Sequence, residues 1–264
     1  MITKNYKERI LYDKCPLCVS EKFSDFYLGN CSKHPSYKDN LDPIIKWMKC
    51  ESCSHVFTNG YYNEETLQKI FSVVQKNQNV GHDIEKNRVI SSKIIDKIFH
   101  YKSDGYWLDI GFGNGSLLFT AHEYGYIPVG LDLRKQNISQ MKYFDIECYD
   151  KDIEEFQYKQ KFSVISMADV LEHTRFPVKV LISVRKLLKK NGIIFISLPN
   201  SETKLWEIAT KQNANPYWGE MEHYHNFSRS RLFSLLKEQG FKTLSYGISE
   251  RYRMCMEIIA SKNE

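Results

Sequence analysis

The chain has 264 residues, with 37 Lys and Arg against 32 Asp and Glu and a formal net charge of +5 at pH 7. Hydrophobic residues make up 42% of it, enough for a full α/β core with about 80 residues to spare. No apolar run approaches the roughly 20 residues that a membrane-spanning helix needs, and the N-terminus lacks a secretory core. We therefore expect a cytoplasmic protein with one large domain and a smaller addition.

Two cysteine knuckles mark the smaller addition. Cys15-Pro16-Leu17-Cys18 and Cys50-Glu51-Ser52-Cys53 are separated by 31 residues. Each knuckle turns tightly enough to aim two thiolates at one ion, and four thiolates suit a closed, tetrahedral zinc site. A reducing cytoplasm disfavours disulfides, and an iron-sulfur cluster is the other four-cysteine alternative, although no redox motif accompanies these residues. We predict structural Zn²⁺ on Cys15, Cys18, Cys50 and Cys53, with Cys31, His34 and His55 as bystanders.

We expect a zinc-binding module at residues 1–62, followed by a helical linker or lid at 63–83. Asn63-Glu64-Glu65-Thr66 begins a predicted helix, and residues 77–82 are the candidate mobile segment. Over residues 84–99, apolar side chains recur near helical spacing, which predicts an amphipathic helix packed on a sheet. The large domain is expected to span residues 84–264.

Residues 107–110 read as a buried strand that runs into a turn with glycines at positions 111, 113 and 115. Such glycines let a ligand approach the backbone closely at the carboxyl edge of a parallel sheet. A dinucleotide-binding turn would carry its third glycine where this chain has Ser116. Asp109 would repel a pyrophosphate but attract the cationic amino-acid end of S-adenosylmethionine.

Further acids follow at the ends of the next predicted strands. Asp132 ends a strand at residues 127–133 and lies 21 positions after Gly111, a spacing that suits a carboxylate accepting from ribose hydroxyls. A third strand at 145–149 leads to Asp152 and Ile153, which could bracket an adenine. A fourth strand begins at Phe162 and ends in a loop that contains Asp169, Glu172 and His173. Each acid alone could be a helix cap, but their order favours one shared ligand.

On these segments the chain resembles the class I S-adenosylmethionine-dependent methyltransferases over residues 84–260. The resemblance implies an α/β, Rossmann-like doubly wound seven-stranded sheet, closed by an antiparallel hairpin at residues 242–246 and 254–260. It also implies S-adenosyl-L-methionine as cofactor. The implied cofactor-binding residues are Asp109, Gly111, Phe112, Gly113, Gly115, Asp132, Leu133, Asp152, Ile153, Ala168, Asp169 and His173.

An irregular aromatic stretch at residues 199–227 should overhang the ligand crevice and wall the acceptor pocket. Glu222-His223, followed by Phe227-Ser228 and a helix at 231–239, matches the acid-histidine pair that supplies the general base in the family's sugar enzymes. The resemblance therefore implies His223 as the base, with Glu222 fixing its tautomer. His225 and His173 are the alternates.

The knuckles followed by a short strand and a helix resemble a zinc-bearing subgroup that methylates nucleotide-linked sugars and related metabolites of polysaccharide and natural-product pathways. We predict transfer to a small polar acceptor, at oxygen: a nucleotide-linked sugar, a phosphorylated metabolite or a surface-polysaccharide precursor. The alternatives are an RNA methyltransferase and a sugar C-methyltransferase, although the subgroup's sugar C-methyltransferases carry a further C-terminal domain. Because Arg185, Lys186, Lys189 and Lys190 read as a solvated helix face, nucleic acid is not the expected partner.

Overall fold

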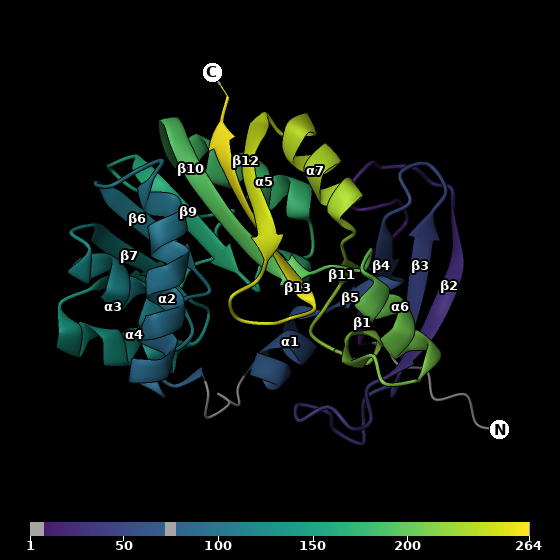
Figure 1. Ribbon diagram of the computed structural model, residues 1–264. Helices are drawn as coiled ribbons and strands as arrows, with labels where there is room; N and C mark the ends of the chain where they lie inside the picture. Colours follow the sequence, from purple (N-terminus) through teal and green to yellow (C-terminus); the bar gives the residue numbers. More distant parts are fainter. Residues whose placement is uncertain (1–7, 72–77, 264) are drawn as a thin grey trace. The chain divides into compact units, whose positions relative to one another are not determined.

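The computed structural model describes residues 8–71 and 78–263, and contacts divide them into two compact units (Figure 1). The first unit comprises residues 8–71, Glu172–Pro177 and Pro199–Leu232. The second comprises residues 78–171, Val178–Leu198 and the residues from Phe233 onward. The sequence-based boundaries after residues 62 and 83 differ from this division and stay predictions. The predicted mobile segment at 77–82 begins outside the described residues, with Asn77.

The second unit contains a seven-stranded mixed sheet in the order β12-β13-β10-β9-β6-β7-β8. The five strands from β10 to β8 are parallel to their neighbours, whereas β12 and β13 form an antiparallel hairpin. All seven residues of β9 are buried, as expected for a parallel strand covered on both faces. The predicted α/β fold is therefore confirmed. Its strands are β6 (Tyr106–Ile110), β7 (Ile127–Leu131), β8 (Glu147–Tyr149), β9 (Phe162–Ala168), β10 (Leu188–Pro199), β12 (Phe241–Ile248) and β13 (Cys255–Lys262).

Helices pack on this sheet through apolar side chains at helical spacing. Helix α2 spans Ile84–Phe99, as predicted, and buries Ile94, Ile95 and Ile98 against Trp107 of β6 and Phe195 of β10. Helix α3 (Ser116–Glu123) contributes to the same cluster, so α2 and α3 cover one face (Figure 1). The remaining helices around the sheet are α4 (Lys135–Met141), the short η2 (Lys142–Phe144) and α5 (Pro177–Leu187).

The first unit is built on a four-stranded sheet in the order β11-β4-β3-β2. Its edge strand β11 (His225–Asn226) pairs antiparallel with β4 (Val56–Thr58), although the two strands are far apart in sequence (Figure 1). The Nε1 atom of Trp47 donates a 3.0 Å hydrogen bond to the carbonyl of Trp218, which again joins the early and late segments. The other strands are β2 (Phe23–Asn30), β3 (Ile44–Cys50) and the pair β1 (Arg9–Leu11) and β5 (Gly60–Tyr62).

Two further helices lie close to the positions that the sequence predicted. Helix α1 spans Glu64–Phe71, and the side-chain oxygen of Asn63 accepts from the amide of Thr66 at 2.9 Å, as an N-cap does. Helix α7 spans Arg229–Glu238, close to the predicted 231–239. Short helices also occur at η3 (Leu171–His173), α6 (Lys204–Lys211) and η4 (Pro216–Trp218). Within residues 8–71 and 78–263, no helix has the length and apolar character that crossing a membrane requires.

Candidate functional site

The glycine turn after β6 has the backbone conformation that the sequence predicted. Gly111, Gly113 and Gly115 have φ values of +67°, +54° and +77°, which L side chains rarely adopt. A Cβ atom at Gly111 would lie 2.7 Å from Cγ2 of Val170, whereas one at Gly113 would have 3.9 Å to its nearest neighbour. The absence of a Cβ atom at Gly111 therefore allows Val170 to pack against the turn, and its absence at Gly113 leaves the backbone open to an approaching group.

Asp132 holds this turn from the end of β7. Its Oδ2 atom accepts a 3.0 Å hydrogen bond from the amide of Gly113, and its Oδ1 atom accepts a 2.8 Å bond from the amide of Arg134. The Asp132 side chain is fully buried between these donors. An ionised carboxylate can accept about four bonds, so Asp132 has the capacity to accept from a ribose hydroxyl in addition.

Asp109 lies within β6, opposite Ser166 of β9 in the strand register. The Ser166 hydroxyl donates a 2.6 Å hydrogen bond to Oδ1 of Asp109. Burial, together with the charge of Asp132, raises the pKa of Asp109 to about 7 against the opposing effects of Ser166 and Arg251. A cationic ligand would favour the ionised form of Asp109.

Asp169 follows β9 with a φ of +58°, a strained value that Asp tolerates better than most residues. Its amide donates to the carbonyl of Ser197 at 2.7 Å, and its carboxylate lies 3.3 Å from Nε of Arg251. Sequence reasoning missed Arg251 because it lies between the hairpin strands, more than 80 residues later.

The predicted adenine-side acid Asp152 accepts a 2.8 Å hydrogen bond from the amide of Glu154.

The other predicted cofactor residues differ in exposure. Phe112, Ile153 and Ala168 are buried, while Leu133 is 55% exposed. His173 belongs to the first unit and lies beside His223. The cofactor assignments of all these residues stay predictions.

The second unit therefore carries a donor set that fits S-adenosylmethionine. Asp109, Asp132 and Asp169 lie at or beside the carboxyl ends of β6, β7 and β9, which are neighbours in the sheet. Carboxylates beside an open glycine turn suit a cation and ribose hydroxyls, whereas a pyrophosphate would be repelled.

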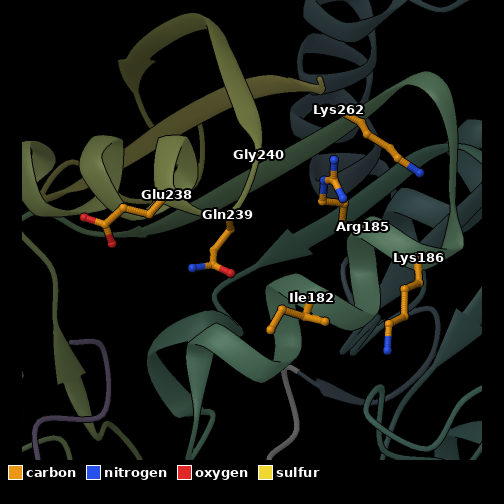
Figure 2. A pocket seen from close by; sticks show the side chains of 7 residues that line it. All are labelled: Ile182, Arg185, Lys186, Glu238, Gln239, Gly240 and Lys262. Atoms are coloured by element: carbon orange, nitrogen blue, oxygen red, sulfur yellow. The ribbon is translucent and has the colours of Figure 1, made fainter. Parts of the chain in front are cut away.

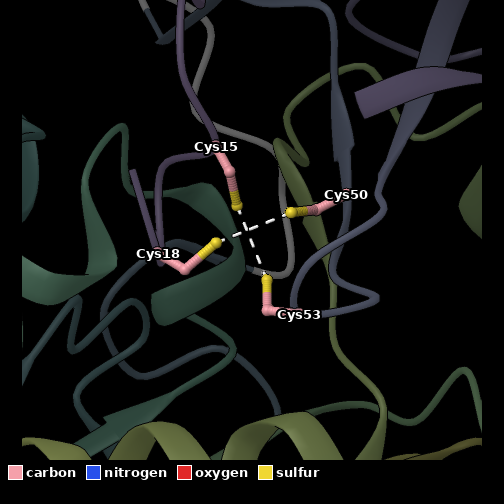
Figure 3. A group of neighbouring side chains, drawn as sticks. All are labelled: Cys15, Cys18, Cys50 and Cys53. Carbon is pink, nitrogen blue, oxygen red and sulfur yellow. Dashed lines mark hydrogen bonds between the residues drawn. The ribbon is translucent and has the colours of Figure 1, made fainter. Parts of the chain in front are cut away.

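The four cysteines of the two knuckles meet in the first unit (Figure 3). Their sulfur atoms point toward one centre and lie within 4.8 Å of one another, at 3.7 Å for Cys15 and Cys53 and 3.5 Å for Cys18 and Cys50. None forms a disulfide. Zinc–sulfur bonds of about 2.3 Å in a tetrahedron place sulfurs roughly 3.8 Å apart. The cluster has the size that this ion requires.

The two knuckles share one backbone design. The amide of Val19 donates to the carbonyl of Cys15, and the amide of Ser54 donates to the carbonyl of Cys50, both at 2.9 Å. Val19 and Ser54 have φ values of +53° and +58°. Cys31, His34 and His55 are not members of the four-cysteine group.

A second cluster in the first unit joins Glu172, His173 and His223, whose ligand-type atoms lie within 4.8 Å of one another. The amide of Tyr224 donates to the carbonyl of Glu172 at 2.8 Å, and Nδ1 of His173 lies 3.0 Å from the carbonyl oxygen of Glu222. The rings of His173 and His223 are nearly perpendicular, with centroids 4.5 Å apart. The loops at residues 172 and 223 are thus fixed together.

His223 is only 5% exposed, and its Nδ1 atom has no hydrogen-bond partner within residues 8–71 and 78–263. Burial lowers the pKa of His223 to about 3, and the charge of His173 lowers it further, while Glu220 opposes the shift. The His223 ring is therefore neutral at ordinary pH.

The structure places Glu222 differently from the predicted pair. Its carboxylate accepts a 3.2 Å hydrogen bond from the hydroxyl of Ser36, while its carbonyl meets His173. The acid whose charge acts on His223 is Glu220, which pairs with His34. Burial acts to raise the pKa of Glu220, but the bond from His34 and the charges of the histidines lower it to about 2. Sequence reasoning missed His34, Ser36 and Glu220, since no local motif connects them.

His225 occupies a buried chain of hydrogen bonds. Its Nε2 atom donates to the carbonyl of Thr174 at 2.8 Å, so its Nδ1 atom accepts from Nε2 of His55 at 3.0 Å. Burial lowers the pKa of His225 to about 3. Both ring nitrogens of His225 are engaged, whereas His223 keeps an Nδ1 atom without a hydrogen-bond partner in the described part of the chain.

A cavity of about 500 Å³ in the second unit contains none of the predicted site residues (Figure 2). Burial lowers the pKa of Lys262 there, as do the charges of Arg185 and Lys161. The prediction of a single cationic helix face is wrong, because α5 ends at Leu187 and both Lys189 and Lys190 lie in β10, which begins at Leu188. The lining residues are Ile182, Arg185, Lys186, Glu238, Gln239, Gly240 and Lys262.

Comparison with known proteins defines the class. Residues 82–246 match the family model described as methyltransferase domain, which is more than half of the chain. The chain belongs to this family, and this segment is a class I S-adenosylmethionine-dependent methyltransferase domain.

Among curated relatives, the ubiquinone biosynthesis O-methyltransferase of Histophilus somni is 32% identical over 113 residues, 38% of this chain and 48% of the relative. The enzyme of the same name from Vibrio vulnificus is 28% identical over 175 residues, 58% of this chain and 74% of the relative. The chain thus spans about half the length of the first curated relatives it matches.

Solved structures share the fold. The 1,6-didemethyltoxoflavin-N1-methyltransferase of Burkholderia thailandensis, which holds S-adenosylhomocysteine, gives a TM-score of 0.57 at 14% identity, covering 81% of this chain and 98% of that one. The magnesium protoporphyrin IX methyltransferase of Synechocystis, also with bound S-adenosylhomocysteine, gives 0.53 at 14% identity, with coverage of 67% and 84%. At these identities the likeness establishes the α/β methyltransferase fold.

Proposed function

We propose that this protein transfers the methyl group of S-adenosylmethionine to an oxygen atom of a small polar acceptor. The observation that carries the proposal is the row of Asp109, Asp132 and Asp169 beside the open glycine turn, within the segment that matches the family. The names of the curated relatives, which are O-methyltransferases, support oxygen as the acceptor atom.

The residues of this chain would bind and orient the two reactants. Asp132 accepts from the ribose, Asp109 attracts the cationic amino-acid end, and Asp152 with Ile153 brackets the adenine. The cofactor supplies an activated methyl group on a cationic sulfur. Because that leaving group is already activated, alignment of the acceptor does most of the work and can lower a barrier by about 7 to 11 kcal/mol in favourable cases.

The proton of the acceptor hydroxyl must also leave, and we assign this activation to His223. The neutral ring and the available Nδ1 atom of His223 support the assignment. A pKa of about 3, caused by burial, makes His223 a weak proton acceptor when it acts alone. Glu222 would contribute through its carbonyl oxygen, which contacts Nδ1 of His173. His225 would fix the nearby backbone through its hydrogen bond to the carbonyl of Thr174.

We further propose that the four-cysteine cluster holds zinc in a structural role. The sulfur separations of 3.5 and 3.7 Å support this ion. Four protein ligands leave no position for water or substrate, so the ion would stabilise the first unit and take no part in methyl transfer.

The acceptor class rests on the resemblance to enzymes of sugars and related metabolites. Nucleotide-linked sugars, phosphorylated metabolites and surface-polysaccharide precursors are the candidates, and sugar C-methylation is an alternative outcome of the same screen. An RNA acceptor is the second candidate, favoured by the cationic cavity around Arg185, Lys186 and Lys262.

The test is calorimetric titration with S-adenosylmethionine, followed by a methyl-transfer screen with small metabolites and RNA. We expect wild-type binding and a loss of about tenfold or more for Asp132→Ala, whereas the exposed Asp150→Ala control should bind normally. Equal affinity of Asp132→Ala would remove the ribose assignment. Absence of binding to the folded wild type would overturn the proposed function, and turnover on RNA alone would favour the second candidate.

A further inference from the structure

We propose that Glu172, His173 and His223 form a site for one divalent metal ion, separate from the four-cysteine cluster. One carboxylate and two imidazoles present their ligand atoms within 4.8 Å of one another. This donor set suits ions such as Mn²⁺, Fe²⁺, Co²⁺ or Zn²⁺, and three protein ligands leave coordination positions open for water or an acceptor oxygen.

The backbone fixes the two halves of this site before any ion arrives. Glu172 and His173 come from η3, while His223 precedes β11, and the bond from the Tyr224 amide to the Glu172 carbonyl holds these segments together. A rigid arrangement lowers the entropic cost of bringing ligands from two segments to one ion.

His173 has the partner that a metal-binding histidine requires. Its Nδ1 atom lies 3.0 Å from the Glu222 carbonyl oxygen, and since a carbonyl only accepts, Nδ1 carries the proton. The lone pair of His173 is therefore on Nε2, the atom available to an ion. Such a hydrogen bond from the other ring nitrogen to a carbonyl is the usual support of a metal-bound histidine.

His223 supplies an independent observation. Its side chain is buried, with 5% exposed, and Nδ1 has no hydrogen-bond partner in the described part of the chain. A buried ring nitrogen without a partner is unfavourable, and an ion bound by the His223 ring would supply the missing partner.

An outer layer of carboxylates surrounds the ligands. Glu220 pairs with Nε2 of His34, and Glu222 accepts from the Ser36 hydroxyl. These partners keep both acids in place near the histidines, where negative charge favours a cation. The layer joins residues of the N-terminal segment to the loop before β11.

The ion would also have a role in the proposed function. This catalytic role rests on the proposed function, whereas binding of the ion does not. An acceptor hydroxyl on the open position would lose its proton to water more readily, because the ion stabilises the oxyanion. The oxygen then forms the new C–O bond while the C–S bond breaks and its electron pair stays on sulfur. The products are the methyl ether, S-adenosylhomocysteine and one released proton. With the ion bound, this role replaces the role of base for His223: its ring would be a ligand, and water would accept the proton.

The test titrates Mn²⁺ into the full-length protein with zinc on its cysteines, following free Mn²⁺ by electron paramagnetic resonance. Mn²⁺ favours oxygen and nitrogen over thiolate ligands, so it distinguishes this site from the cysteine cluster. We expect one equivalent to bind, and Glu172→Gln and His223→Gln to weaken binding by about tenfold or more. The exposed His122→Gln should bind as the wild type does.

Circular dichroism and S-adenosylmethionine titration on the same samples check folding. If Glu172→Gln disturbs the fold, His223→Gln alone is compared with the wild type. Titration with Co²⁺, followed by its absorption spectrum, is the second measurement of binding. Failure of the folded wild type to bind either ion would overturn the proposal, as would equal affinity in the folded variants. Metal binding without binding of S-adenosylmethionine would overturn the proposed function and leave the metal site standing.

Discussion

The two units of this protein are specified in different ways. The second unit is a mostly parallel sheet whose central strand β9 is a continuous buried run, since all seven of its residues are buried. The first unit brings together residues from three separate stretches of chain, with β11 paired to β4 and Trp47 bonded to Trp218. Local pattern along the chain thus predicts the central elements of the second unit, whereas the pairing of β11 with β4 in the first unit has no local signal.

This difference extends to what stabilises each unit. A large apolar cluster of helix and strand residues supports the second unit. The first unit also buries apolar side chains such as Trp47, Phe57 and Phe227. It adds polar groups with specific partners, among them the four cysteines and the hydrogen-bonded pair of His55 and His225. Loss of one such group should therefore affect the first unit more than loss of one methyl group affects the second.

The largest effect should follow loss of the predicted zinc. Removal of the ion, or Cys50→Ser, should unfold the first unit while the second keeps its structure, because structural zinc contributes about 10 kcal/mol or more in small modules. Hydrogen exchange of the amides in β3 and β9 measures the two units separately. Cys148→Ser, which lies in β8 outside the cluster, is the control. Retained protection of β3 in metal-free protein would refute the structural role of zinc.

Gly29→Ala should be the next most damaging change. A Cβ atom there would lie 1.7 Å from the carbonyl oxygen of Trp218, so the strand must move away from the late segment. We expect a loss of about 3 kcal/mol or more in the free energy of unfolding. Gly247→Ala in β12 is the matched control, since nothing lies within 4 Å of its Cβ position. Equal urea midpoints for the two variants would contradict this account.

Asp109 should give the second unit a pH-dependent stability. Burial raises its pKa in the folded state to about 7 from a usual 3.8, so the folded protein binds more protons between these values. Stability should therefore fall by about 2 kcal/mol from pH 5 to pH 7 through this group. Asp109→Asn should remove that contribution, as urea titrations at both pH values would measure. An unchanged slope would show that Asp109 is ionised in the folded protein.

The smallest effect concerns the cationic cavity. Burial lowers the pKa of Lys262 most, and the charges of Arg185 and Lys161 also lower it. These two cations therefore repel Lys262. Arg185→Gln should stabilise the second unit by less than about 1 kcal/mol, and high salt should abolish the gain. The exposed Lys142→Gln is the control in the same denaturation experiment. A gain that persists in high salt would point to packing instead of charge.

The sequence by itself determined the class of the protein and several of its elements. Helical spacing predicted α2 with its observed bounds, and the acids placed after apolar strands predicted the carboxyl edge of the sheet. The two knuckles predicted the cysteine cluster, because each brings its own pair of sulfurs together within four residues. These features depend on neighbours along the chain, which periodicity and turn chemistry describe.

Only the tertiary structure decided which distant side chains meet. His34 lies beside Glu220, Arg251 beside Asp169, and Glu172 beside His223, although no local pattern links the members of these pairs. Their meeting depends on strand register and on the paths of loops, and one residue of slip in β11 would turn its side chains to the other face. The chemistry of the histidine cluster is therefore a property of the fold, because its residues are far apart in the sequence and come together only in the folded chain.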